Sequence, residues 1–229
     1  MIRIFSGVFA SVLVLGFVSC ASISVDKGAE YATPHMPKLI YVAFFDASHG
    51  DFRVDREGAE LASFKQNLQV MLQAGMVKDL SARLVPAAPA REGQSFSKRE
   101  NAWFIRGEFT RVNQGSRALR GIVGFGAGGT KLETRISVYD LSEGTDLPFL
   151  TFTTTGGSNA EPGAVTGLAT DPLTLVIQTA AGGAGGVAHG LTEDAARTAR
   201  ENTAMLSDYM YRSGWISKDK WIAPKQVSK

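Results

Sequence analysis

Cysteine is almost absent from this sequence: Cys20 is the only one in 229 residues, which excludes an internal disulfide. The three histidines, His35, His49 and His189, are far apart, and no two of them have the spacing of a metal site on a helix. A strong charge of one sign is also lacking. The formal net charge is only +2, which argues against a nucleic-acid-binding surface. We therefore expect no metal, no other cofactor and no nucleic-acid partner.

An apolar N-terminal segment ends at the single cysteine. Arg3 is the only charged residue before Cys20, the residues between them are apolar or small, and Ser19 supplies the small residue that cleavage requires. Phe17 stands where lipoprotein signals usually have leucine. We expect residues 1–19 to be a lipoprotein signal peptide. The Cys20 sulfur would then carry diacylglycerol, with acyl chains such as palmitate that hold the chain on a membrane.

The residue after the cysteine bears on the location. Ala21 follows Cys20 where an aspartate would favour the inner membrane, so we expect an outer-membrane lipoprotein that faces the periplasm. Two alternatives stay open. The leader could be an ordinary signal peptide, or an uncleaved anchor, because residues 4–25 carry no charge and have about the length that spans a bilayer.

The rest of the chain is long enough for one domain with its own hydrophobic core, since about 210 residues follow the leader. Residues 20–37 are polar and contain two prolines, which favours a tether. We expect a single domain over residues 38–223 and a basic tail over residues 224–229. A segment rich in glycine and alanine, residues 156–190, interrupts the domain, and glycine at this density opposes regular structure.

Hydrophobic periodicity predicts an α/β (α+β) sandwich. Its mixed, mostly antiparallel sheet would have about four to five strands, three of them in a meander, packed by two main helices. Strands are expected at residues 39–45, 82–85, 102–112, 131–139 and 147–155. One helix is expected over residues 57–74, ended by Gly75, and a closing helix over residues 192–213, with Thr192 as its N-cap and Gly214 after its end.

Two of the expected strands alternate clearly. In the first, Trp103 and Ile105 would face the core and Glu108 would face outward; in the second, Ile136 would face the core and Arg135 outward. If these strands pair antiparallel, their outward charges can form cross-strand arginine–glutamate pairs, each contributing a few tenths of a kcal/mol.

The segment that joins these two strands carries the main candidate site. Its glycines precede a strand, whereas a dinucleotide fingerprint or a P-loop needs a helix there, so nucleotide binding is not indicated. We interpret it as a loop that binds a partner through apolar side chains with a basic rim. The candidate binding residues are Arg117, Arg120, Ile122, Val123 and Phe125. The glycines expected to serve the backbone alone are Gly115, Gly121, Gly124, Gly126 and Gly128.

The stretch GSRALRGIVGFGAGGTKLETRISVYD, with Gly144 after it, resembles the signature of a bacterial lipoprotein family known as domain of unknown function 4410. The later glycine-rich segment and the closing helix are similar to that family as well. The resemblance implies a lipoprotein α/β domain, and it implies no particular reaction. The order of elements is also remotely similar to the periplasmic domain of lipoproteins in curli secretion and of those that activate peptidoglycan synthases, but topology does not fix function.

Three function classes follow from these observations. The first is a non-enzymatic envelope lipoprotein that binds a protein or cell-wall partner and that can form an oligomer. The second is a subunit of an outer-membrane assembly or secretion pore, with a glycine-rich segment in the lipid. The third, and least supported, is a hydrolase that uses Asp46, His49 and Asp51, which lie together after the first strand. A polar surface loop is the commoner reason for such a cluster.

Overall fold

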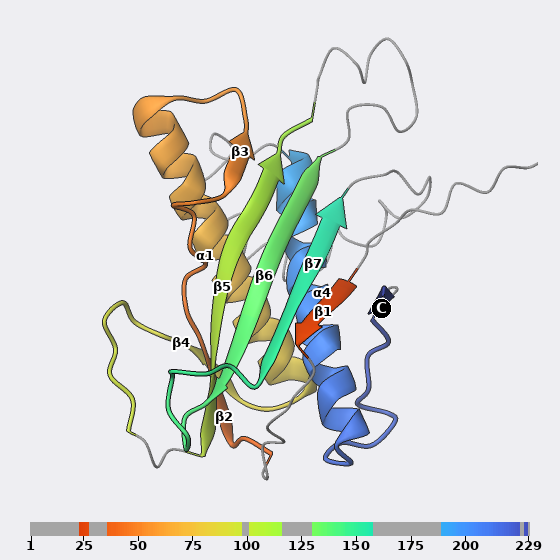
Figure 1. The fold of residues 1–229 in the computed structure, drawn as a ribbon. Coiled ribbons are helices and arrows are strands. Elements are labelled where there is room, and N and C mark those ends of the chain that lie inside the picture. Colours follow the sequence, from red (N-terminus) through yellow and green to blue (C-terminus); the bar gives the residue numbers. More distant parts are fainter. Residues whose placement is uncertain are drawn as a thin grey trace, which may run out of the picture.

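The computed structural model describes residues 23–27, 36–97, 101–115, 130–157, 189–224 and 227–228. In these residues, eight strands form one sheet and two long helices, α1 and α4, cover one of its faces (Figure 1). The strand order is β4-β2-β5-β6-β7-β1-β8, and β3 pairs with β5 beyond the end of β2. The predicted α/β sandwich is confirmed, and short strands at its edges make the sheet wider than the sequence pattern indicated.

The long strand pairings are antiparallel and the short ones are mostly parallel. The bounds are β1 Ile23–Lys27, β2 Leu39–Val42, β3 Asp51–Arg53, β4 Ala87–Pro89, β5 Ala102–Asn113, β6 Lys131–Asp140, β7 Leu150–Gly157 and β8 Val227–Ser228. The strands β5, β6 and β7 form the predicted meander, while β2, β3 and β4 join it through parallel pairs. The sheet is therefore mixed, and its central ladder is antiparallel.

The first helix is longer than the sequence suggested. Helix α1 spans Gly58–Arg83 and runs straight through Gly75, so the prediction that this glycine ends it was wrong. Burial of Met76 and Leu80 after the glycine explains the difference. Two buried side chains contribute more than the roughly 1 kcal/mol that an internal glycine costs a helix. The expected strand at 82–85 is instead the end of this helix and the turn after it, and the strand follows as β4.

The closing helix also begins earlier than predicted. Helix α4 spans His189–Arg212, so Thr192 lies inside it and is not its N-cap. Its C-terminus is as expected. Gly214 has φ of +74°, which glycine adopts without strain, and the N–H of Trp215 donates to the carbonyl oxygen of Met210 at 2.9 Å.

The main core lies between the sheet and the two helices. Trp103, Ile105 and Ile136 are all buried there, as their alternation predicted, together with Phe64 and Leu68 of α1. A second, smaller cluster lies on the opposite face of the sheet, where Tyr41, Phe96, Phe104 and Tyr139 gather near the β4 end. The sheet thus has apolar packing on both faces at one end and an open polar face toward the other.

Candidate functional site

The candidate loop follows β5 and precedes β6, and the structure describes its two ends. Figure 1 shows these ends together at one end of the sheet, and the last residue of β5, Asn113, lies opposite the first residue of β6, Lys131. Residues 116–129 lie outside the described residues. The predicted binding residues Arg117 to Phe125 and the glycines Gly121, Gly124, Gly126 and Gly128 fall there, and Cys20 lies outside them too.

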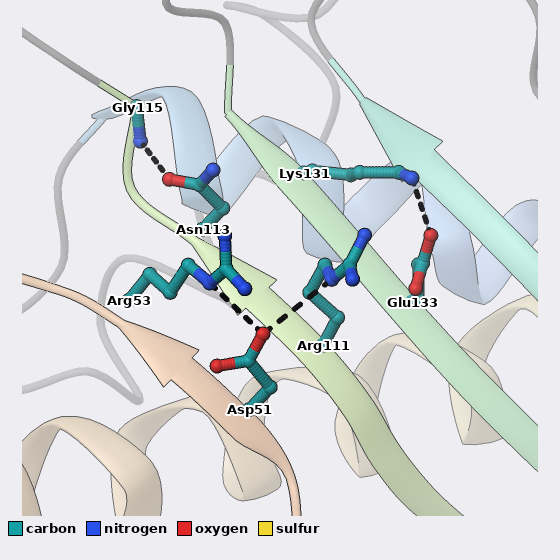
Figure 2. Close-up of polar contacts among 7 residues, drawn as sticks. All are labelled: Asp51, Arg53, Arg111, Asn113, Gly115, Lys131 and Glu133. Atoms are coloured by element: carbon teal, nitrogen blue, oxygen red, sulfur yellow. Dashed lines mark hydrogen bonds and ion pairs between the residues drawn. The ribbon is translucent and has the colours of Figure 1, made fainter.

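The first end of the loop is fixed by hydrogen bonds. Gly115 has φ of +74°, and its N–H donates to Asn113 Oδ1 at 2.8 Å (Figure 2). Gln114 is buried. Its N–H donates to the carbonyl oxygen of Arg53 at 3.1 Å, and its Oε1 accepts a hydrogen bond from Arg56 at 2.8 Å. These contacts fix the backbone conformation of Gln114 and Gly115, where the chain leaves β5.

A charged cluster surrounds the base of the loop, and sequence analysis missed it. Asp51 on β3 pairs with Arg53 at 2.9 Å and with Arg111 on β5 at 3.6 Å, while Lys131 on β6 pairs with Glu133 at 2.5 Å (Figure 2). No local pattern predicts it, because residues 46–55 have the polar composition of a surface loop. The parallel pairing of residues 51–53 with the end of β5 brings three strands together here.

This cluster is accessible and carries one more basic than acidic group. The side chains of Arg53, Arg111 and Lys131 are 64%, 41% and 40% exposed. Ion pairs at such exposure add little stability, typically up to about 1 kcal/mol. The exposed guanidinium groups can exchange their present carboxylate partners for those of another molecule.

The other end of the loop meets a buried carboxyl group. Thr130 is buried just before β6, and Asp194 of α4 is fully buried beside it. Burial raises the pKa of Asp194 to about 6, and a hydrogen bond with Thr130 and the charge of Arg197 only partly oppose this. Close packing of the helix on the sheet explains the burial. A Cβ added at Gly156 of β7 would overlap the side-chain oxygen of Thr198, so only glycine fits at that position.

A groove of about 820 Å³ lies at the opposite end of β5, next to the small apolar cluster. Phe44, Phe96 and Phe104 contribute aromatic surface to it, and Gln69, Gln94 and Arg106 contribute polar groups. The guanidinium of Arg106 lies 5.2 Å from the ring centre of Phe104 and 5.3 Å from that of Tyr139, so its charge interacts with both aromatic rings. The sequence did not indicate this groove, because it is built from segments that are distant along the chain.

The three polar residues after the first strand do not form one arrangement. Asp46 accepts hydrogen bonds from the N–H of Ser48 at 2.8 Å and from its hydroxyl at 2.6 Å, and these bonds lower the pKa of the Asp46 carboxyl. Asp51 is engaged by two arginines, and His49 is exposed. Asp46 thus stabilises the turn that contains Ser48, and Asp51 belongs to the charged cluster.

Two negative observations apply to the part of the chain that the structure describes. Within those ranges, no three His, Cys, Asp or Glu side chains gather so that they could hold a metal ion. Neither described helix combines the length and the apolar character needed to cross a membrane.

Comparison with known proteins matched one family and several solved structures. A family model described as "Domain of unknown function (DUF4410)" matches residues 12–174. A PelC dodecamer from Paraburkholderia phytofirmans shares 12% identity at a TM-score of 0.38, covering 69% of this chain and 90% of that chain. A point variant of the same dodecamer shares 13% identity at a TM-score of 0.33, and the match covers 60% of this chain and 82% of that chain. The comparison with curated proteins gave no match.

Proposed function

The chain belongs to the DUF4410 family, and we propose that it is a lipid-anchored, non-enzymatic protein of the cell envelope that binds a protein or cell-wall partner through residues 116–129. Cys20 would hold it on the outer membrane, facing the periplasm. Part of the expected tether, residues 20–37, joins the sheet as β1, so the domain expected over residues 38–223 also takes in that strand. The anchor is supported by the position of the single cysteine after an apolar leader.

The contacts that hold the two ends of residues 116–129 support the proposed binding site. The hydrogen bonds of Gln114 and Gly115 fix one end, and the burial of Thr130 fixes the other. A loop held at both ends on a rigid sheet loses less conformational entropy when a partner binds than a free segment does. Binding residues are commonly carried on loops that a rigid scaffold positions in this way.

The charges at the base indicate what kind of partner would fit. Arg53, Arg111 and Lys131 lie at the loop's base, and the loop itself adds Arg117 and Arg120. A partner surface with carboxylates would be attracted by these cations. The apolar side chains of the loop, Phe125 above all, would then supply the buried anchor that dominates binding energy at most interfaces.

The experiment is crosslinking in intact envelopes, followed by capture of the detergent-solubilised, full-length protein. Arg117→Glu reverses a charge in the loop, and Phe125→Asp removes its apolar anchor. Lys218→Glu is the matched control, because Lys218 is exposed in the turns that follow α4 and lies in none of the contacts described above. Circular dichroism and the melting temperature establish that each variant is folded.

We expect the wild type and Lys218→Glu to capture the same envelope component, and each loop variant to capture at least tenfold less of it. Loss of charge attraction and of a buried aromatic anchor would each account for an effect of that size. Equal capture by both folded loop variants would show that residues 116–129 are not the interface.

A further inference from the structure

We propose that the groove beside Phe44 binds an uncharged oligosaccharide. Its volume of about 820 Å³ is in the range of small-molecule sites in proteins. It is separate from the loop over residues 116–129, because Arg106 of β5 lines the groove and Asn113 of the same strand lies at the base of the loop. These two residues are seven positions apart, which corresponds to about 23 Å along an extended strand.

The aromatic part of the groove matches the faces of a sugar ring. Phe44 is 45% exposed and lines the groove together with Phe96 and the buried Phe104, whose ring centres are 4.7 Å apart. A pyranose ring presents C–H groups on its faces, and these pack on aromatic surface as apolar groups do. Burial of an exposed phenylalanine against such a face removes apolar area from water.

The polar part of the groove matches the hydroxyl groups around the ring edge. Gln69 Nε2 donates to the carbonyl oxygen of Phe45 at 2.7 Å, and Gln94 Oε1 accepts from the N–H of Arg91 at 2.9 Å. Each amide plane is thus fixed by one of its ends, and the other end makes no hydrogen bond within the described residues. A hydroxyl group both donates and accepts, so it can use the free oxygen of Gln69 or the free NH₂ of Gln94. Fixed partners of this kind reduce the entropy cost of binding.

The charges in the groove favour an uncharged ligand. Arg91 and Arg106 are matched by Glu92 and Asp146, so the lining has no net charge. A phosphate or polyanion site would carry a surplus of basic groups or a cradle of main-chain N–H groups. The groove therefore has the mixture of aromatic, amide and balanced charged groups that suits a neutral, hydroxyl-rich molecule.

A peptide strand is disfavoured because three main-chain oxygens near the groove, at and just after the ends of β2 and β4, are already bonded. Gln73 Nε2 donates to the carbonyl oxygens of Val42 at 2.8 Å and of Ala90 at 3.3 Å, and Gln69 takes that of Phe45. A peptide that extends a sheet needs such groups to be free. The two glutamines of α1 thus occupy three main-chain oxygens that a peptide strand could otherwise use.

The test is calorimetric titration of the full-length protein in detergent micelles with tetrasaccharides. The uncharged probes are cellotetraose, maltotetraose and the tetramer of N-acetylglucosamine; the charged probes are tetragalacturonate and the tetramer of glucosamine. Phe44→Ala removes the exposed ring. Tyr211→Ala is the matched control, because Tyr211 is an exposed aromatic residue on α4, 38% accessible and outside the groove.

At least one uncharged probe is expected to bind the wild type one-to-one. Its affinity for Phe44→Ala is expected to be at least tenfold lower, and its affinity for Tyr211→Ala unchanged. The charged probes are expected to bind the wild type at least tenfold more weakly than that uncharged probe. Failure of every uncharged probe to bind the wild type, or equal binding by the folded Phe44→Ala protein, would overturn the proposal. Phe44-dependent binding of a decapeptide library without sugars would assign the groove to a protein partner instead. None of these results depends on residues 116–129, so the two proposals can fail separately.

Discussion

Replacing Asp194 by asparagine tests the electrostatic account of the region where α4 packs on the sheet. The substitution keeps the size of the side chain and removes its charge. Since burial raises the pKa of Asp194 from 3.8 to about 6, the native protein holds this proton more tightly than the unfolded chain does. Ionisation of Asp194 therefore lowers the free energy of unfolding.

The sign and the size follow from that pKa. The contribution of Asp194 to the free energy of unfolding is largest below pH 3.8. It falls as the pH rises from 3.8 to about 6, and it stays at its lowest value at higher pH. A shift of about two pKa units corresponds to about 3 kcal/mol in total. About 2 kcal/mol of this falls between pH 4.5 and pH 7.5, because about 1 kcal/mol is already lost at pH 4.5. Asparagine does not titrate, so the variant lacks this loss.

The assay is urea unfolding of the wild type and Asp194→Asn at pH 4.5 and pH 7.5, followed by circular dichroism. The difference in stability between variant and wild type should shift by about 2 kcal/mol in favour of the variant at the higher pH. Glu143→Gln, which removes one exposed carboxylate in the turn after β6, is the control and should show no comparable shift. If Asp194→Asn differed from the wild type by the same free energy of unfolding at both pH values, burial would not raise the pKa of Asp194. This holds whatever asparagine itself costs.

Three further substitutions test the packing. Gly107→Ala should lower the free energy of unfolding by about 1–3 kcal/mol, because its Cβ would overlap the buried ring of Phe45; an unchanged urea midpoint would contradict this. Gln73→Leu should cost about 1–2 kcal/mol in the same assay, since the carbonyl oxygen of Ala90 loses its side-chain donor and that of Val42 keeps only the N–H of Ala90; a gain in stability would count against that role. Arg135→Glu should cost only a few tenths of a kcal/mol, since its pair with Glu108 is about half exposed. The double variant with Glu108→Arg should restore the loss, and a double-mutant cycle measures whether it does.

The parts of the fold set by local pattern could be predicted from the sequence. Alternation in β5 and β6 placed Trp103 and Ile136 in the core, and it indicated that outward charges can form cross-strand arginine–glutamate pairs if the strands are antiparallel. The structure has one such pair, Glu108 with Arg135, at 3.1 Å. Gly214 marked the end of α4. In each case the side chain's neighbours lie within the same strand, hairpin or helix turn, so the spacing along the sequence carries the information.

The parts that depend on distant segments could not be predicted. Gly75 suggested a helix end, and burial of Met76 by other elements overrode that local signal. The strand β3 has only three residues, and it becomes a strand through its pairing with the end of β5. The charged cluster at the loop base and the groove beside Phe44 follow from such pairings, which explains why the sequence indicated neither arrangement, although Asp51 of the cluster was among the candidate residues.

Mass spectrometry of the protein purified from the membranes of its native host tests the lipid anchor. We expect a mature chain that begins at Cys20, with the mass of diacylglycerol on its sulfur. A mature chain that keeps residues 1–19, or that carries an unmodified Cys20, would contradict the lipid anchor and with it the proposed place of this protein in the envelope.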